Sequence, residues 1–74
     1  MRARDFEDRI RSMGLAPRGV VHHPRLDDVL VVYLNELDEH WTKEASTALI
    51  LTVPGVSMVT VDSRSKWMLL VRIP

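Results

Sequence analysis

The feature that most constrains this chain is its last strand-like segment, residues 67–73, which is largely apolar on both faces. Successive side chains of a strand point to opposite sides. One side carries Trp67, Leu69, Val71 and Ile73, and the other carries Met68, Leu70 and Arg72. Such a strand belongs in the middle of a sheet and needs cover on both faces. A chain of 74 residues has little material for two covering layers, so we expect a partner on one face.

Composition indicates one globular domain, residues 1–74, with 46% hydrophobic and 27% charged residues. The absence of cysteine excludes disulfides, thiolate chemistry and the usual structural zinc sites. Small domains without disulfides or structural metal ions often gain stability by oligomerising. No apolar run approaches ~18 residues and no signal-type segment follows Met1, so we expect a cytoplasmic protein with no membrane partner. Eight arginines against two lysines are typical of a GC-rich bacterial or phage accessory protein.

The zero net charge conceals a segregation along the chain. Residues 1–25 hold six arginines against three acids, a balance of +3, whereas residues 26–50 hold one lysine against six acids, a balance of −5. Residues 51–74 return to +2. Surfaces of opposite sign suit self-association or a charged protein partner. Neutralisation between packed elements of the same chain explains the pattern equally well.

The apolar periodicity predicts two helices and four strands, in the order α-β-β-α-β-β. The expected elements are helix 3–13, strands 19–23 and 28–34, helix 38–52, and strands 56–62 and 67–73. Phe6, Ile10 and Met13 form the apolar stripe of the first helix, which Gly14 ends. A loop at 63–66 joins the last two strands.

The second helix is expected to begin with Asn35 or Asp38 as its N-cap and to end before Pro54 and Gly55. Its predicted buried face consists of Leu37, Trp41, Ala45, Ala48, Leu49 and Thr52. In the strand that follows, Val59 and Val61 lie on one face and Met58, Thr60 and Asp62 on the other.

These elements assemble into a specific α+β fold, a four-stranded antiparallel sheet with two helices on one face. Strands 28–34 and 67–73 are the two apolar ones, so we place them in the middle. Strand 19–23 then flanks strand 28–34, and the more polar strand 56–62 forms the other edge. A right-handed crossover through the second helix joins strand 28–34 to strand 56–62.

The C-terminal half resembles a known family. The pattern Leu49-x3-Val53-Pro54-Gly55-Val56-x2-Val59-x-Val61-Asp62-x2-Ser65-Lys66 is similar to the helix end and hairpin of ferredoxin-like domains of the heavy-metal-associated type. With the preceding helix and strand, the chain looks like a circular permutation of that fold. The family's Met-x-Cys-x-x-Cys metal loop has no counterpart in residues 35–40. The resemblance therefore implies a fold and no copper binding.

The leading functional hypothesis is a protein-interaction surface on the uncovered face of the sheet, formed by a homodimer through this face or through an edge strand. The residues expected there are Val29, Val31, Tyr33, Met58, Met68 and Leu70, with Thr60, Asp62 and Arg72 toward the rim. Methionine and tyrosine suit adaptable contact surfaces. The alternative is that the first helix crosses to this face and closes an α/β/α sandwich.

Nucleic-acid binding is the first functional alternative, because arginines gather near the N-terminus. The candidate residues are Arg2, Arg4, Arg9, Arg11 and Arg18, joined by Arg25. Three acids, Asp5, Glu7 and Asp8, interleave with them and weaken the attraction to phosphate. Only Tyr33 is available to stack bases on a sheet.

A metal-binding module around His22 and His23, with Asp27, Asp28 and His40, is the second alternative. Adjacent residues of a strand point to opposite faces, which argues against one shared ion. We therefore assign no metal ligands and expect no cofactor. The chain has no nucleophile elbow, P-loop or His-Glu-x-x-His motif, so we also expect it not to be an enzyme.

Overall fold

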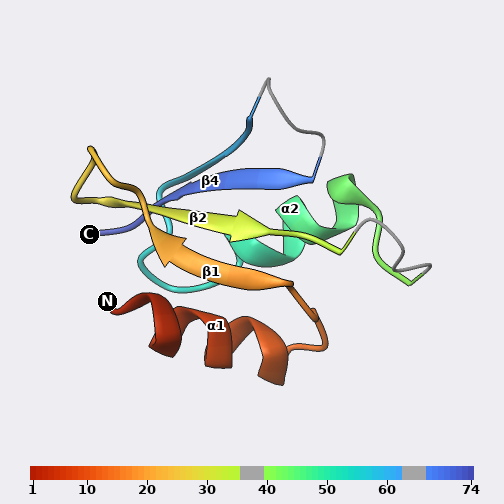
Figure 1. Ribbon diagram of the computed structural model, residues 1–74. Coiled ribbons are helices and arrows are strands. Elements are labelled where there is room, and N and C mark those ends of the chain that lie inside the picture. Colours follow the sequence, from red (N-terminus) through yellow and green to blue (C-terminus); the bar gives the residue numbers. More distant parts are fainter. Residues whose placement is uncertain (36–39, 63–66) are drawn as a thin grey trace.

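The computed structural model describes residues 1–35, 40–62 and 67–74. Its elements are α1 (Ala3–Ser12), β1 (Gly19–His22), β2 (Val29–Tyr33), α2 (Lys43–Leu51), β3 (Met58–Val61) and β4 (Met68–Arg72). The four strands form one antiparallel sheet in the order β1-β2-β4-β3 (Figure 1). The α+β class, the element order and the central place of the last strand are thus confirmed. The loop expected at 63–66 lies outside the described residues.

The first helix follows its sequence pattern closely. Phe6 and Ile10 are fully buried on one side of α1, and Gly14 ends the helix with a φ of 102°, a conformation that residues with a Cβ rarely adopt. The side chain of Arg2, the N-cap, makes no capping bond. Instead the backbone N–H of Ala3 donates to Nε2 of His22 at 3.3 Å, which ties the start of α1 to β1.

The second helix begins later than predicted. Its N-cap is Thr42, whose side-chain oxygen accepts a hydrogen bond from the backbone N–H of Ala45 at 3.1 Å. Asn35 is therefore not the cap, and Asp38 lies outside the described residues. Threonine is one of the residue types preferred as an N-cap, because its side-chain oxygen accepts a hydrogen bond from a free N–H of the first turn. The end of the helix near Thr52 agrees with the prediction.

The predicted buried face of α2 is right for Trp41 and Leu49 and wrong for Ala45, Ala48 and Thr52. Ser46 and Ile50 are buried and Val53 follows on the same side, whereas Ala45, Ala48 and Thr52 are exposed. Trp41 and Leu49 are partly buried against the core, and Leu37 lies outside the described residues. Burying Ile50 and Val53 removes more apolar area from water than burying two alanines. The small Ser46 lets the helix backbone approach the sheet closely.

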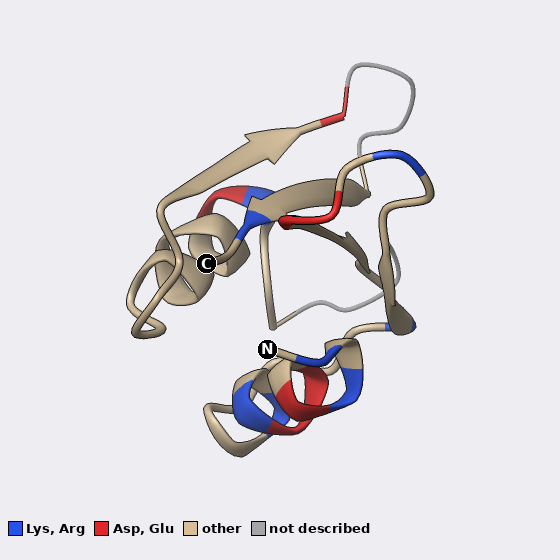
Figure 2. Ribbon diagram, turned by 90° about the vertical axis from the view of Figure 1, so that its left-hand side faces the viewer, with Lys and Arg blue, Asp and Glu red and all other residues tan. Residues whose placement is uncertain are grey.

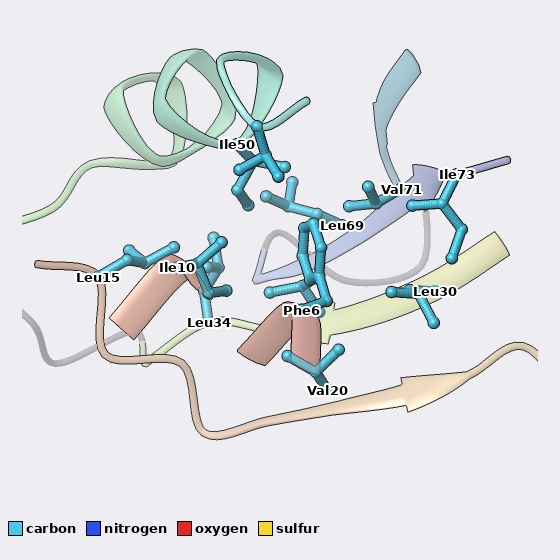
Figure 3. Close-up of a cluster of buried hydrophobic side chains, with 12 residues drawn as sticks. Phe6, Ile10, Leu15, Val20, Leu30, Leu34, Ile50, Leu69, Val71 and Ile73 are labelled. Carbon is cyan, nitrogen blue, oxygen red and sulfur yellow. The ribbon is translucent and has the colours of Figure 1, made fainter. Parts of the chain in front are cut away.

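Both helices pack on the same face of the sheet, here called the core face, which comprises Val20, Leu30, Val32, Val59, Leu69 and Val71. Phe6 and Ile10 from α1 and Ile50 from α2 converge on these side chains (Figure 3). The strand registers place Leu30 opposite Val71 and Val32 opposite Leu69. Both helices are thus committed to one layer, and α1 does not cross to form an α/β/α sandwich.

Trp41 closes the core between the two helices. Its indole N–H donates to the carbonyl oxygen of Gly14 at 2.9 Å. The segment that leads into α2 is thereby joined to the turn that ends α1. Because the hydrogen bond satisfies the polar end of the ring, the rest of the ring can pack against the core without an unpaired donor.

Candidate functional site

The side of the sheet away from the helices, here called the open face, is the main candidate for a functional surface. It is formed by Val21, Val29, Val31, Tyr33, Met58, Thr60, Met68 and Leu70. The registers pair Val31 with Leu70 and Tyr33 with Met68, and Thr60 lies opposite Leu70 on the next strand. The structure therefore brings all six predicted interaction residues onto one surface.

The six residues differ in how far they reach solvent. Val29 and Val31 are only 4% and 5% exposed, so they form the floor of the open face. Tyr33 and Met58 are 36% and 46% exposed and stand above it. Met68 and Leu70 are partly buried. An approaching molecule would touch the outer residues first and the two valines little.

Two exposed residues belong to this surface and were not predicted. Val21 of β1 is 47% exposed and lies opposite Val31. Leu26, in the connection between β1 and β2, is 43% exposed. The alternation in Val20-Val21-His22 was a signal for Val21, because Val20 faces the core. For Leu26 no periodic signal exists, since its position depends on how the loop folds.

The connection between β1 and β2 shapes one end of the open face. Nδ1 of His23 accepts hydrogen bonds from the backbone N–H groups of Arg25 and Leu26 at 3.1 and 3.2 Å. This turn places the loop on the side of the sheet away from the helices (Figure 2). Leu26 there lines a depression of about 110 Å³ together with Met58 and Leu70. A wider hollow of about 720 Å³ separates His23 and Arg25 from Thr60 and Asp62.

The rim of the open face is polar. An ion pair joins Arg72 to Asp28 at 3.3 Å, with both side chains about half exposed. Solvent screens such a pair strongly, so it contributes little to stability. The predicted rim residues Thr60, Asp62 and Arg72 thus border an apolar centre, which is the arrangement of many protein contact surfaces.

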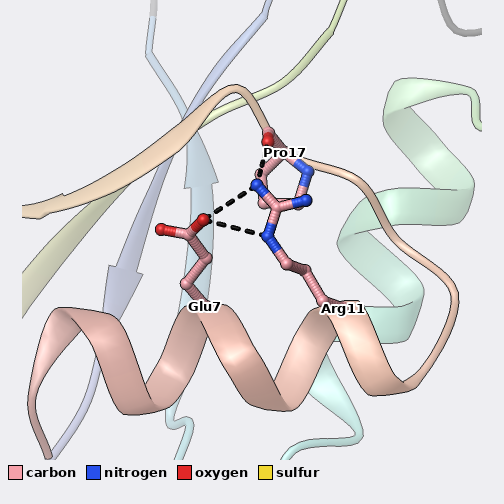
Figure 4. A network of polar contacts seen from close by, with 3 residues as sticks. All are labelled: Glu7, Arg11 and Pro17. Atoms are coloured by element: carbon pink, nitrogen blue, oxygen red, sulfur yellow. Dashed lines mark hydrogen bonds and ion pairs between the residues drawn. The ribbon is translucent and has the colours of Figure 1, made fainter.

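The N-terminal arginines do not form a single cationic surface. Arg11 donates to the Oε2 of Glu7, with an Nη2–Oε2 distance of 2.8 Å, and Nη2 also donates to the carbonyl oxygen of Pro17 at 2.9 Å (Figure 4). Arg11 therefore holds the connection between α1 and β1. Arg2, Arg4, Arg9 and Arg18 are exposed, but basic and acidic residues alternate along α1 (Figure 2).

The two adjacent histidines have separate structural contacts. His22 accepts a hydrogen bond from Ala3 at the start of α1, whereas His23 accepts from its own loop on the other side of the sheet. Across residues 1–35, 40–62 and 67–74, no group of three His, Cys, Asp or Glu side chains is close enough to hold a metal ion.

Comparisons with protein-family models, curated proteins and solved structures return no match for this chain. Within the part of the chain that the structure describes, neither helix has the length and apolar character needed to cross a membrane.

Proposed function

We propose that this chain is a small non-enzymatic protein of the cytoplasm that acts by binding protein, and that a second copy packs on its open face. The observation that carries the proposal is that α1 and α2 cover the same face of the sheet. Among the described residues, the other face of the two apolar central strands is left without a covering layer. An apolar patch of this size is comparable to the largest that a soluble monomer normally keeps, and such patches are often functional contact surfaces.

Charge favours a second copy as the occupant. The net charge of the chain is zero, so two copies meet without long-range repulsion. The rim carries both signs, Arg25 and Arg72 against Asp28 and Asp62. A two-fold axis can therefore bring basic groups of one copy near acidic groups of the other.

The size of the open face predicts a modest affinity. Four strands ~4.8 Å apart and ~15 Å long present about 300 Å² per copy. Burying about 600 Å² in total yields a gross gain near 15 kcal/mol at ~25 cal/mol per Å². Association itself costs about 4–15 kcal/mol. The gain is an upper limit, because Val29 and Val31 are already buried in the single chain. We therefore expect a weak, reversible dimer rather than a permanent complex.

The direct test is the solution mass as a function of concentration, combined with a charge on the open face. Val21→Glu and Tyr33→Glu replace exposed side chains at the surface, so each chain should stay folded by circular dichroism while the mass of the assembly falls by about half. Ala16→Glu adds the same charge at an exposed position away from the sheet and should leave the mass unchanged. A wild-type protein that is monomeric at ~100 μM overturns the dimer.

The strand order supports the proposed kinship with the ferredoxin-like fold. A helix crossover joins β2 to β3, and β4 lies between them. Moving the first helix and strand to the end of the chain yields the β-α-β-β-α-β order of that fold. The resemblance noted in the sequence thus remains a proposal about architecture only.

Nucleic-acid binding is less well supported than protein binding. Arg11 is engaged with Glu7 and Pro17, and three acids lie on the same helix. Retention on DNA or RNA that falls with added salt, and that Arg4→Glu with Arg9→Glu abolishes, would favour this alternative. An increase in melting temperature with zinc or nickel would favour the metal-binding alternative.

A further inference from the structure

A second contact surface lies at the β3 edge of the sheet. β3 pairs with β4 on one side and, among the described residues, with no strand on the other. Natural edge strands are usually guarded by charge, proline or a bulge that prevents pairing with another chain. The four residues of β3, Met58–Val61, include neither a charge nor a proline, and Met58, Thr60 and Val61 are exposed.

The hydrogen-bond pattern shows which backbone groups of β3 face outward. The N–H of Asp62 donates to the carbonyl oxygen of Met68 at 2.9 Å. Asp62 and Met68 thus continue the β3–β4 register, in which Thr60 lies opposite Leu70. In an antiparallel ladder the bonding side alternates with each residue. The N–H and C=O groups of Val59 and Val61 therefore point away from β4, where another strand could bind them.

An apolar groove runs beside this edge, between β3 and α2. Its volume is about 370 Å³, and its lining consists of Lys43, Glu44, Thr47, Ala48, Leu51 and Val61. Leu51 is 49% exposed and Val61 37%. The groove exists because α2 buries Ser46 and Ile50 rather than the expected alanines, so its Ala48 and Leu51 remain uncovered.

We infer that two copies of this chain pair along β3, antiparallel, to form a continuous eight-stranded sheet. Val59 then lies opposite the partner's Val61. The outward N–H and C=O groups of these two residues form hydrogen bonds with each other across the interface. Thr60 lies on the two-fold axis, opposite the partner's Thr60. The two α2 helices flank the axis on the core side, where Leu51 and Ala48 of each copy cover the groove of the other.

Area is the reason for choosing a second copy as the occupant. One open face of about 300 Å² is well below the ~800 Å² per partner of a standard interface. Pairing at β3 places two open faces side by side and doubles the surface that one contact can bury. Edge pairing and face packing together predict an assembly of four chains, with two eight-stranded sheets packed face to face. The choice of a second copy and the larger assembly rest on the proposed function, whereas the free backbone edge of β3 is an independent observation.

The chain has no cysteine, so any disulfide formed by a single introduced cysteine joins two copies. Directly opposed residues of an antiparallel pair have Cβ atoms about 4.5–5.5 Å apart, close enough for Thr60→Cys to cross-link across the axis after small adjustments. Ala16→Cys is the exposed control away from both surfaces. Under mild oxidation we expect most of the Thr60→Cys chain, and little of the control, to run as a dimer on a non-reducing gel.

Three further variants separate this inference from the proposed function. Val61→Pro removes an outward N–H that points away from β4 and bonds to no other described backbone group. It should abolish the Thr60→Cys cross-link and lower the solution mass about twofold. Val61→Thr keeps that N–H and should change neither. If the proline variant does not fold, Val61→Lys is the substitute, because a charged lysine on an edge strand also prevents pairing with another chain. Val21→Glu should leave the cross-link intact, because the open face is not needed for it.

A cross-link confined to Thr60→Cys and lost with Val61→Pro or Val61→Lys supports the inference, whatever happens at the open face. An assembly that Val21→Glu dissociates, in which Thr60→Cys cross-links no better than Ala16→Cys, overturns the inference and leaves the proposed function standing. Pairing of β3 with an unrelated peptide, with the protein itself monomeric and uncross-linked, overturns both self-association proposals.

Discussion

The two faces of the central strands are nearly equal in apolar content but differ in what covers them. On the core face, Leu30 and Leu69 are buried beneath side chains from α1 and α2. On the open face, Val29 and Val31 are almost as buried, although neither helix packs on this side. Val31 lies between Val21 and Leu70 of the neighbouring strands, and Val29 lines a depression with Leu26. A strand can therefore be apolar on both faces without two covering layers. The outer residues of the open face, and not its centre, are the ones that remain exposed.

Removing a large side chain from the core face should produce the largest effect. Phe6→Ala deletes a fully buried ring and should cost about 3–5 kcal/mol of unfolding free energy, most of the stability of a domain this small. Urea denaturation followed by circular dichroism measures it. Tyr33→Ala, the matched aromatic deletion on the open face, should cost less than about 1 kcal/mol. Equal losses would show that the two faces are covered alike.

Placing a charge on the floor of the open face should also destabilise the chain strongly. Val31 is 5% exposed even without a partner, so Val31→Asp buries a carboxylate and should lower the free energy of unfolding by about 2–4 kcal/mol. The neighbouring Val21→Glu, at an exposed position, should lower it by less than about 0.5 kcal/mol. A fully stable Val31→Asp monomer would mean that the floor of the open face is accessible to water.

A smaller effect is expected where the two helices meet. Trp41→Phe keeps an aromatic ring but removes the donor to the Gly14 carbonyl at the edge of the core. The expected loss is about 1 kcal/mol of unfolding free energy, the net value of one hydrogen bond. Urea denaturation measures it, with Trp41→Ala as the comparison, because that variant also removes the packing of the ring and should lose clearly more. A Trp41→Phe variant as stable as the wild type would show that the bond to Gly14 contributes nothing.

The smallest effect is expected at the rim of the open face. Asp28→Asn removes one partner of the half-exposed Asp28–Arg72 pair and should change stability by at most about 0.5 kcal/mol, less at high salt. Thermal midpoints at low and high ionic strength provide the measurement. A large, salt-insensitive loss would contradict the description of this rim as solvated.

Local pattern was sufficient for most of the fold. The stripe of Phe6 and Ile10, the stop at Gly14 and the two uninterrupted apolar strands each carry their own signal, because helix and strand periods differ. The strand order followed from the polarity of the strands: the two apolar strands take the middle and the others the edges. The six residues expected on the open face lie on one side of the sheet, as the same alternation predicted.

The orientation of α2 was not predictable in this way. Its sequence offers two apolar faces, one with Ala45 and Ala48 and one with Ile50 and Val53, and their difference in buried area appears only against a sheet. The burial of Val31 could not be predicted either, since it depends on the side chains of the neighbouring strands, where Val21 and Leu70 lie beside it.

By itself, the sequence determined the elements, their order in the sheet and the alternation that divides its two faces, because these depend on short-range periodicity and polarity. Only the tertiary structure decided which side of α2 is buried, which open-face residues reach solvent, and that a groove opens beside the β3 edge. These depend on how much area each packing removes from water, and that quantity exists only once the elements are in contact.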